Sequence, residues 1–157
     1  MKIKVIVVGK TLKGFIGQGV DEYLKRLKRY LRVEMLVIPD VRSGKNFPIE
    51  QLMRKEEELI LSSIANGSEV FLLDEQGREY TSVELASFVE EKMVSGTKEL
   101  TLIIGGAYGV TQAVKLRVSG VIALSKLTFS HQMIRVILFE QLYRAMTIIR
   151  GEPYHHI

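Results

Sequence analysis

Short apolar runs alternate along the chain with longer segments of helical periodicity, and this alternation limits the folds open to it. Five apolar runs have the length of strands, at residues 3–8, 33–38, 70–73, 100–104 and 121–124. Between and after them lie segments with apolar residues three and four apart, which predict helices at 19–31, 52–64, from 81 to about 96, 111–118 and 132–150. Strict alternation of this kind predicts an α/β fold with a mostly parallel sheet covered by helices on both faces.

Local signals sharpen this prediction. Thr81 and Glu84 have the spacing of a capping box and would open the third helix. A polar loop is expected between Pro39 and Pro48, and a turn at 74–80. The run at 100–104 is nearly all apolar, which is typical of a central strand. No linker or repeat divides the chain, so residues 1–157 are expected to form one domain.

The helix at 132–150 is apolar around most of its circumference. Such a helix is buried on more than one side. A second subunit would cover it in a homodimer, which we favour because the core of a chain this small is limited. Burial within the monomer is the alternative.

Composition excludes several classes of protein. The chain has no Cys, which excludes a disulfide framework and Cys-ligated metal sites. The N-terminal apolar run is too short to span a membrane and no signal-peptide cleavage site follows it, so a cytoplasmic protein is expected. The net charge of +4 is a mild bias toward polyanions. No Asp or Glu occurs between Thr101 and Phe139, so an anionic substrate would meet no repulsion there.

Two glycine-containing segments differ from known nucleotide-binding motifs. Gly9-Lys10-Thr11 resembles the end of a P-loop, but Lys4 stands where that motif requires glycine. The segment 105–109 departs from the dinucleotide fingerprint, and the acidic residue expected about 20 positions later is absent.

Ligands of open parallel sheets bind beyond the carboxyl ends of the strands. Loops 73–77, 105–109 and 124–131 are therefore expected to meet there and hold a small molecule.

Charged and aromatic residues near the ends of helices allow two interpretations each. The basic cluster on the first helix, from Lys25 to Arg32, is either a phosphate-binding face or a solvated one. Arg144 either forms a structural pair with Glu140 or presents its guanidinium to an anionic substrate. His131 has either a structural or a functional role. The tail ends in Tyr154, His155 and His156, and composition alone predicts it to be disordered, with no metal-ligand set.

Three segments together carry a family resemblance. IIGGAYG at 103–109, LSKLTFSHQMIRVILFEQLYRA at 124–145 and RGEPYHH at 150–156 resemble the RlmH family of bacterial large-subunit rRNA methyltransferases, within the SPOUT superfamily. The resemblance extends over the whole chain, through the first strand, the first helix and the LLDEQG turn.

The resemblance implies a SPOUT α/β fold with a C-terminal trefoil knot, a homodimer, and S-adenosylmethionine as methyl donor. It implies an enzyme that methylates N3 of a pseudouridine in a stem-loop of 23S rRNA on assembled 70S ribosomes, with no metal and no membrane. By motif position, the cofactor-binding residues are Leu73, Gly105, Leu124, Ser125, Lys126, Leu127, Thr128 and Phe129. The residues at the substrate site are His131, Arg144, Tyr154 and His155.

Two positions depart from the family pattern. Ser130 stands where the family usually has Pro, and His156 where Lys or Arg is common. Either His155 would take the N3 proton or Arg144 would stabilise the resulting anion. Two other functions compete: a SPOUT methyltransferase acting on another base or a ribose hydroxyl, and a non-catalytic RNA-binding module that keeps the fold.

Overall fold

The computed structural model describes residues 1–41 and 48–156, and within them strands and helices alternate as predicted. The strands are β1 (Lys2–Val8), β2 (Arg32–Ile38), β3 (Glu69–Glu79), β4 (Glu99–Ile104) and β5 (Gly120–Ala123). The helices are α1 (Phe15–Leu27), α2 (Ile49–Ser63), α3 (Ser82–Val94), α4 (Gln112–Arg117) and α5 (Met133–Ile149). The polar loop expected between Pro39 and Pro48 lies largely outside the described residues.

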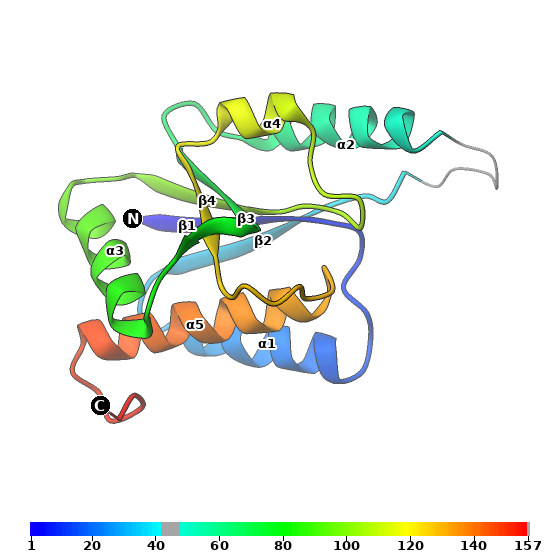
Figure 1. Ribbon diagram of the computed structural model, residues 1–157. Coiled ribbons are helices and arrows are strands. Elements are labelled where there is room, and N and C mark those ends of the chain that lie inside the picture. The colour runs from blue at the N-terminus through cyan, green and yellow to red at the C-terminus, as the bar shows by residue number, and fades with distance from the viewer. Residues whose placement is uncertain (42–47, 157) are drawn as a thin grey trace.

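The five strands form one sheet in the order β2-β1-β4-β3-β5, and every pairing is parallel. The apolar run at 100–104 lies in β4, between β1 and β3, which confirms its central position. Helices α1, α3 and α5 cover one face of the sheet, while α2 and α4 cover the other (Figure 1). Each face has its own cluster of buried side chains, the larger one beneath α1, α3 and α5. The predicted α/β fold is confirmed, and the trefoil knot stays a prediction.

The first helix begins four residues earlier than predicted. Gly14 precedes it with a φ of 86°, and Ile16 extends the buried face by one turn before Val20. Gly19, taken as the helix start, lies inside α1 instead. A Cβ atom there would meet Val136 at 2.9 Å, so Gly19 permits the close approach of α1 and α5.

The third strand is longer than predicted. The turn expected at 74–80 is a bulge within β3, because pairing resumes at Arg78 and Glu79 after a register shift from Leu73. Gly77 lies against the backbone of β5, where a Cβ would come within 2.7 Å of Ile122 atoms. Absence of a side chain at Gly77 thus lets the bulge lie directly on β5.

The capping box at the start of α3 is confirmed. Thr81 Oγ1 accepts a hydrogen bond from the Glu84 amide, and a Glu84 carboxylate oxygen accepts one from the Thr81 amide at 2.7 Å. The second bond holds the pKa of Glu84 below its ordinary value.

Helix α5 is largely buried by its own chain. It packs on the sheet between α1 and α3, with Leu138, Phe139 and Leu142 in the core. Within α5 no large apolar side chain is fully exposed, although several are half-buried. The monomer therefore explains much of the apolar circumference of this helix, and the homodimer stays a prediction. In the described part of the chain, no helix has the length and apolar character needed to cross a membrane.

A buried guanidinium joins the start of α5 to the end of β1. Arg135 is 0% exposed, and it donates hydrogen bonds to the carbonyls of Val8 and Gly9 and to Thr11 Oγ1. Its Nε also donates to the His131 carbonyl at 3.0 Å. Burial lowers the pKa of Arg135 and Asp40 opposes this shift; an arginine nevertheless stays protonated in proteins. One side chain thus fixes two loops at the carboxyl edge of the sheet.

Replacement of Arg135 should destabilise the whole protein. Arg135→Met leaves buried carbonyls without donors, and we expect the free energy of unfolding to fall by about 3 kcal/mol or more. Arg54→Met is the control, because Arg54 makes an exposed pair with Glu50 that contributes at most about 1 kcal/mol. Urea unfolding of both variants measures the difference. Equal losses would contradict the assigned role of Arg135.

Candidate active site

Three loops meet at the carboxyl edge of the sheet and line a cavity of about 590 Å³. They are the three segments predicted from the sequence, at 73–77, 105–109 and 124–131, and the first of them is the bulge within β3 rather than a loop that follows it. The last residues of β4, the middle of β5 and the first turn of α5 complete the lining. The lining is formed by Leu72, Leu73, Asp74, Glu75, Gln76, Ile104, Gly105, Gly106, Ala107, Gly109, Val110, Ile122, Leu124, Ser125, Leu127, Thr128, Phe129, Ser130, His131 and Ile134.

The glycine loop folds back on itself at one side of the cavity. The Gly109 amide donates to the Gly106 carbonyl at 3.0 Å, and Gly109 has a φ of 78°. At Gly105 a Cβ would meet Val110 at 2.9 Å and the Gly109 carbonyl group at 3.1 Å. A side chain at Gly105 would therefore spread the loop, and its glycine keeps main-chain groups accessible to a ligand.

Polar side chains fix the loop at 124–131 on the opposite side. Ser125 Oγ accepts from the Leu127 amide at 2.9 Å. The Thr128 hydroxyl donates to a Glu75 carboxylate oxygen, which joins this loop to the bulge of β3. The Met133 amide donates to Ser130 Oγ, so Ser130 lies at the start of α5 as a capping side chain.

His131 lies between the cavity and α5. Burial lowers its pKa, the nearby Arg135 guanidinium adds to this effect, and Asp40 opposes it. The imidazole of His131 is consequently neutral at neutral pH. Behind the glycine loop, Glu56 is buried near Gly106. Burial, and secondarily Asp40, raise the pKa of Glu56.

A second polar cluster lies at the other end of α5. One oxygen of Glu140 accepts from Arg144 Nε at 3.1 Å, from Arg144 Nη2 at 2.5 Å and from the Tyr154 hydroxyl at 3.1 Å. Arg144 Nη1 lies 3.3 Å from His155 Nδ1, and its guanidinium lies over the Tyr154 ring. The pair of Glu140 and Arg144 exists as the sequence indicated, and it also holds the tail.

The tail is packed on α1 and α5. The Tyr30 hydroxyl donates to Glu152 at 2.5 Å, and the Tyr154 ring packs edge-on against Tyr143. The prediction of disorder from composition is therefore wrong for residues 152–156, because aromatic contacts between distant segments hold them. Burial, with hydrogen bonds to Tyr23 and Glu140, raises the pKa of Tyr154, so its hydroxyl stays protonated at neutral pH.

The two clusters are separate within one chain. His131 lies before the first turn of α5, while Arg144 stands eleven residues after Met133, which is about 16 Å along the axis at 1.5 Å per residue. The chain ends at the opposite end of α5 from the cavity (Figure 1). Of the predicted residues, the structure gathers Leu73, Gly105, Leu124, Ser125, Leu127, Thr128, Phe129 and His131 at the cavity, and Arg144, Tyr154 and His155 at the tail.

Lys126, one of the predicted cofactor-binding residues, does not line the cavity. Its ammonium lies 3.4 Å from Glu79 and its side chain is 82% exposed, outside the lining of the cavity. Among the described residues, no group of three or more His, Asp or Glu side chains is placed to hold a metal ion.

A family model described as "Predicted SPOUT methyltransferase" matches residues 1–155. The chain belongs to the SPOUT methyltransferase family. It is 49% identical over 156 residues to "Ribosomal RNA large subunit methyltransferase H" of Parabacteroides distasonis, and 43% identical to the protein of that name from Flavobacterium johnsoniae. Each alignment covers 99% of both chains.

Solved structures show the same fold at low identity. A probable methyltransferase from Bordetella pertussis superposes with a TM-score of 0.59 at 12% identity, over 92% of this chain and 96% of that one. A probable methylase family protein from Haemophilus influenzae gives 0.56 at 14% identity, over 99% of this chain and 70% of that one. These likenesses support the SPOUT fold alone.

Sequence reasoning missed several lining residues of this SPOUT methyltransferase. Ile104, Ile122 and Ile134 lie in regular elements, and their apolar character marked them only as core. Glu75 was inside a predicted loop, but nothing in the sequence indicated its bond to Thr128. Position at the carboxyl end of a strand is the signal that identifies Ile104.

The hydrogen bond of Tyr30 should be visible by titration. It raises the pKa of Tyr30 to about 12, with Glu152 as the main cause. A raised folded-state pKa contributes stability that is present below about pH 10, the ordinary value, and is lost as pH rises through 12. In Glu152→Ala the pKa of Tyr30 should fall toward 10, measured by phenolate absorbance against Tyr30→Phe.

Glu58→Ala is the control for this titration, because Glu58 is exposed on α2. It should leave the phenolate curve unchanged. A wild-type Tyr30 that titrates near pH 10 would show that the tail is not held by this bond.

Proposed function

We propose that this chain, acting as one domain over residues 1–157, is an S-adenosylmethionine-dependent methyltransferase of N3 of a pseudouridine in a 23S rRNA stem-loop, on assembled 70S ribosomes in the cytoplasm. The cavity formed by three loops at the carboxyl edge of the sheet carries this proposal. Family membership and the names of the full-length relatives support it.

The cavity fits the methyl donor in size and character. Its volume lies within the range of about 300–1,000 Å³ that is usual for small-molecule sites. Apolar side chains such as Leu73 and Leu124 alternate with accessible main-chain groups at Gly105. We infer that Leu73, Gly105, Leu124, Ser125, Leu127, Thr128 and Phe129 hold the donor, and that Lys126 contributes only its main chain.

S-adenosylmethionine supplies a methyl group already activated on a sulfonium. The residues of the protein therefore need to align the attacking atom and remove a proton rather than form a covalent intermediate. N3 of the base carries that proton. His155 would accept it or Arg144 would stabilise the anion, whereas Tyr154 is held protonated and serves as a hydrogen-bond donor. Neutral His131, at the cavity wall, would contact the substrate beside the donor.

A homodimer would unite the two clusters. The tail cluster is too far from the cavity of its own chain to act there, since most of α5 lies between them. A second copy could place its Arg144, Tyr154 and His155 over this cavity. Each active site would then need two chains, and two-fold symmetry would give two such sites.

A methyl-transfer assay tests the function. Purified protein and radiolabelled S-adenosylmethionine are incubated with 70S ribosomes that lack the modification, and with free 23S rRNA in parallel. We expect label at N3 of the stem-loop pseudouridine with ribosomes only. Label at another base or a ribose hydroxyl would assign a different SPOUT activity, and donor binding without transfer to either substrate would point to another RNA. Absence of donor binding would favour a non-catalytic RNA-binding module.

Mixing two inactive variants tests the composite site. Gly105→Val displaces the glycine loop that lines the cavity, and Arg144→Gln disables the tail cluster, so each homodimer should be inactive. After unfolding and refolding together, mixed dimers would contain one intact site of two, restoring about a quarter of wild-type activity. Activity that stays at the level of the separate variants, despite mixed dimers detected by mass, would place both clusters in one chain.

A further inference from the structure

The loop that joins β1 to α1 is exposed beside the candidate active site. Residues 10–15 include most of this loop and Phe15, the first residue of α1. They contain two large apolar side chains that are mostly in solvent, Leu12 at 58% and Phe15 at 69% exposed. Lys10 and Lys13 alternate with them and are also exposed. In the described part of the chain, neither lysine forms an ion pair with an acid.

Buried polar side chains hold this loop in place. Gln132 is 8% exposed and bonds the loop twice, from its Nε2 to the Lys10 carbonyl at 3.0 Å and from the Leu12 amide to its Oε1 at 2.9 Å. Arg135 donates to Thr11 Oγ1 at 3.0 Å. The loop backbone is therefore fixed while its apolar and basic side chains face solvent. A fixed loop loses little conformational entropy when it binds a partner.

The loop also has a defined position relative to the cavity. Gln132 directly follows His131, which lines the cavity, so the loop lies beside that end of the site. Figure 1 shows the segment after β1 next to the segment that leads into α5. A substrate large enough to extend beyond the cavity in this direction would pass over Leu12 and Phe15.

The positive charge of residues 10–15 and the scarcity of acids around them favour a polyanion as the ligand of this surface. Residues 1–20 contain no acidic residue, and neither does the stretch from 101 to 139 that includes Gln132. Asp40 lies against Gly9, at the start of this loop, and acts on the buried Arg135. Alternating lysines and exposed apolar groups suit nucleic acid, in which phosphates pair with ammonium groups and bases stack on aromatic rings.

We propose that residues 10–15 form an RNA-contact surface, in which Phe15 and Leu12 pack against a base of the substrate and Lys10 and Lys13 pair with phosphates. This proposal rests on the proposed function, because it takes the substrate to be rRNA. A second copy of the chain is the competing occupant. If the loop lay on the axis of a dimer, Lys10 and Lys13 of both copies would come together, without acids opposite them.

Binding of unmodified 70S ribosomes by fluorescently labelled protein tests the surface. Phe15→Ala should weaken binding about tenfold, within the range for loss of one stacked base. Lys10→Gln with Lys13→Gln should make the slope of log affinity against log salt shallower by about 1.4, the value for two single-strand phosphate contacts. Affinity for S-adenosylmethionine, measured by calorimetry, should stay at the wild-type value in both variants.

The matched control is Val94→Ala with Lys98→Gln. Both residues are exposed and lie near the start of β4, at the edge of the sheet opposite the cavity. This variant should bind ribosomes as the wild type does. Wild-type affinity and salt slope in the loop variants would overturn the proposal, as would dissociation of a dimer by Phe15→Ala, which would assign the loop to the second copy. Failure of wild-type protein to methylate ribosomes would instead overturn the proposed function.

Discussion

The hydrogen bonds of Arg135 are the interaction on which the candidate site depends. A fully buried guanidinium is costly to desolvate, and it is stable here because the carbonyls of Val8, Gly9 and His131 and the Thr11 hydroxyl satisfy its donors. These acceptors belong to two loops distant in the sequence. The bonds therefore fix both the loop that lines the cavity and the loop beside it, relative to one sheet edge. All of these bonds are donated by a residue of α5, so this helix holds both loops in position.

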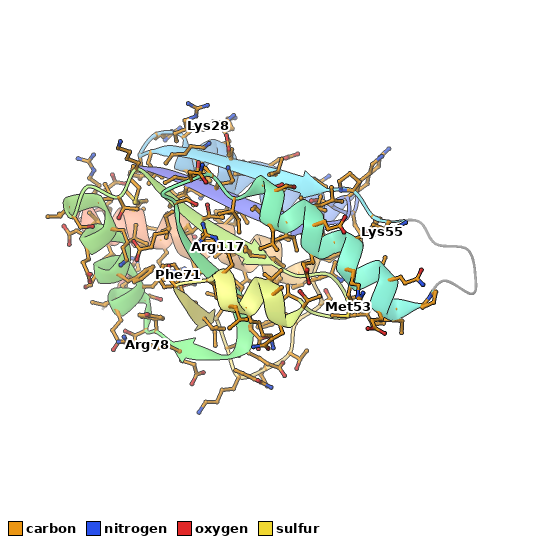
Figure 2. The ribbon with its side chains drawn as sticks, turned by 90° about the horizontal axis from the view of Figure 1, so that it is seen from above. Lys28, Met53, Lys55, Phe71, Arg78 and Arg117 are labelled. Atoms are coloured by element: carbon orange, nitrogen blue, oxygen red, sulfur yellow. The ribbon has the colours of Figure 1, made fainter. Side chains whose placement is uncertain are left out.

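Parallel strands explain why the site forms at this edge. The strands β4, β3 and β5 are neighbours in the sheet, so the loops that follow β4 and β5 converge on the bulge of β3. The bond from Thr128 to Glu75 then joins two of these segments directly. The glycines then decide how closely the loops approach. Gly77 rests on the β5 backbone and Gly105 on the Gly109 turn, and in each place a Cβ would collide. The basic residues at the end of α1 lie at the surface instead. Arg26 pairs with Glu22, and Lys28, which follows the last residue of α1, lies at the margin of the molecule (Figure 2).

The sequence predicted the parts of this structure that depend on local patterns. Hydrophobic periodicity identified the five strands and five helices of the described residues. The spacing of Thr81 and Glu84 alone predicted the capping box of α3. The predictions were wrong where contacts between distant segments determine the local structure. The bulge of β3 depends on pairing with β5, and the order of the tail depends on Tyr30 and Tyr143, far away in the sequence. No periodicity carries such information, and the roles of the tail residues came from the family resemblance.

Glu140 holds Arg144, a residue that we propose for the active site, in a structural ion pair. An arginine in a largely apolar helix needs a partner, and Glu140, one turn earlier, satisfies Arg144. The same carboxylate oxygen accepts from Tyr154, so Glu140 holds both Arg144 and the tail. Arg144 keeps Nη1 directed at His155 and is partly exposed. The ion pair thus orients a cationic and aromatic surface toward solvent, which is where a second chain with its cavity and an anionic substrate would have to approach.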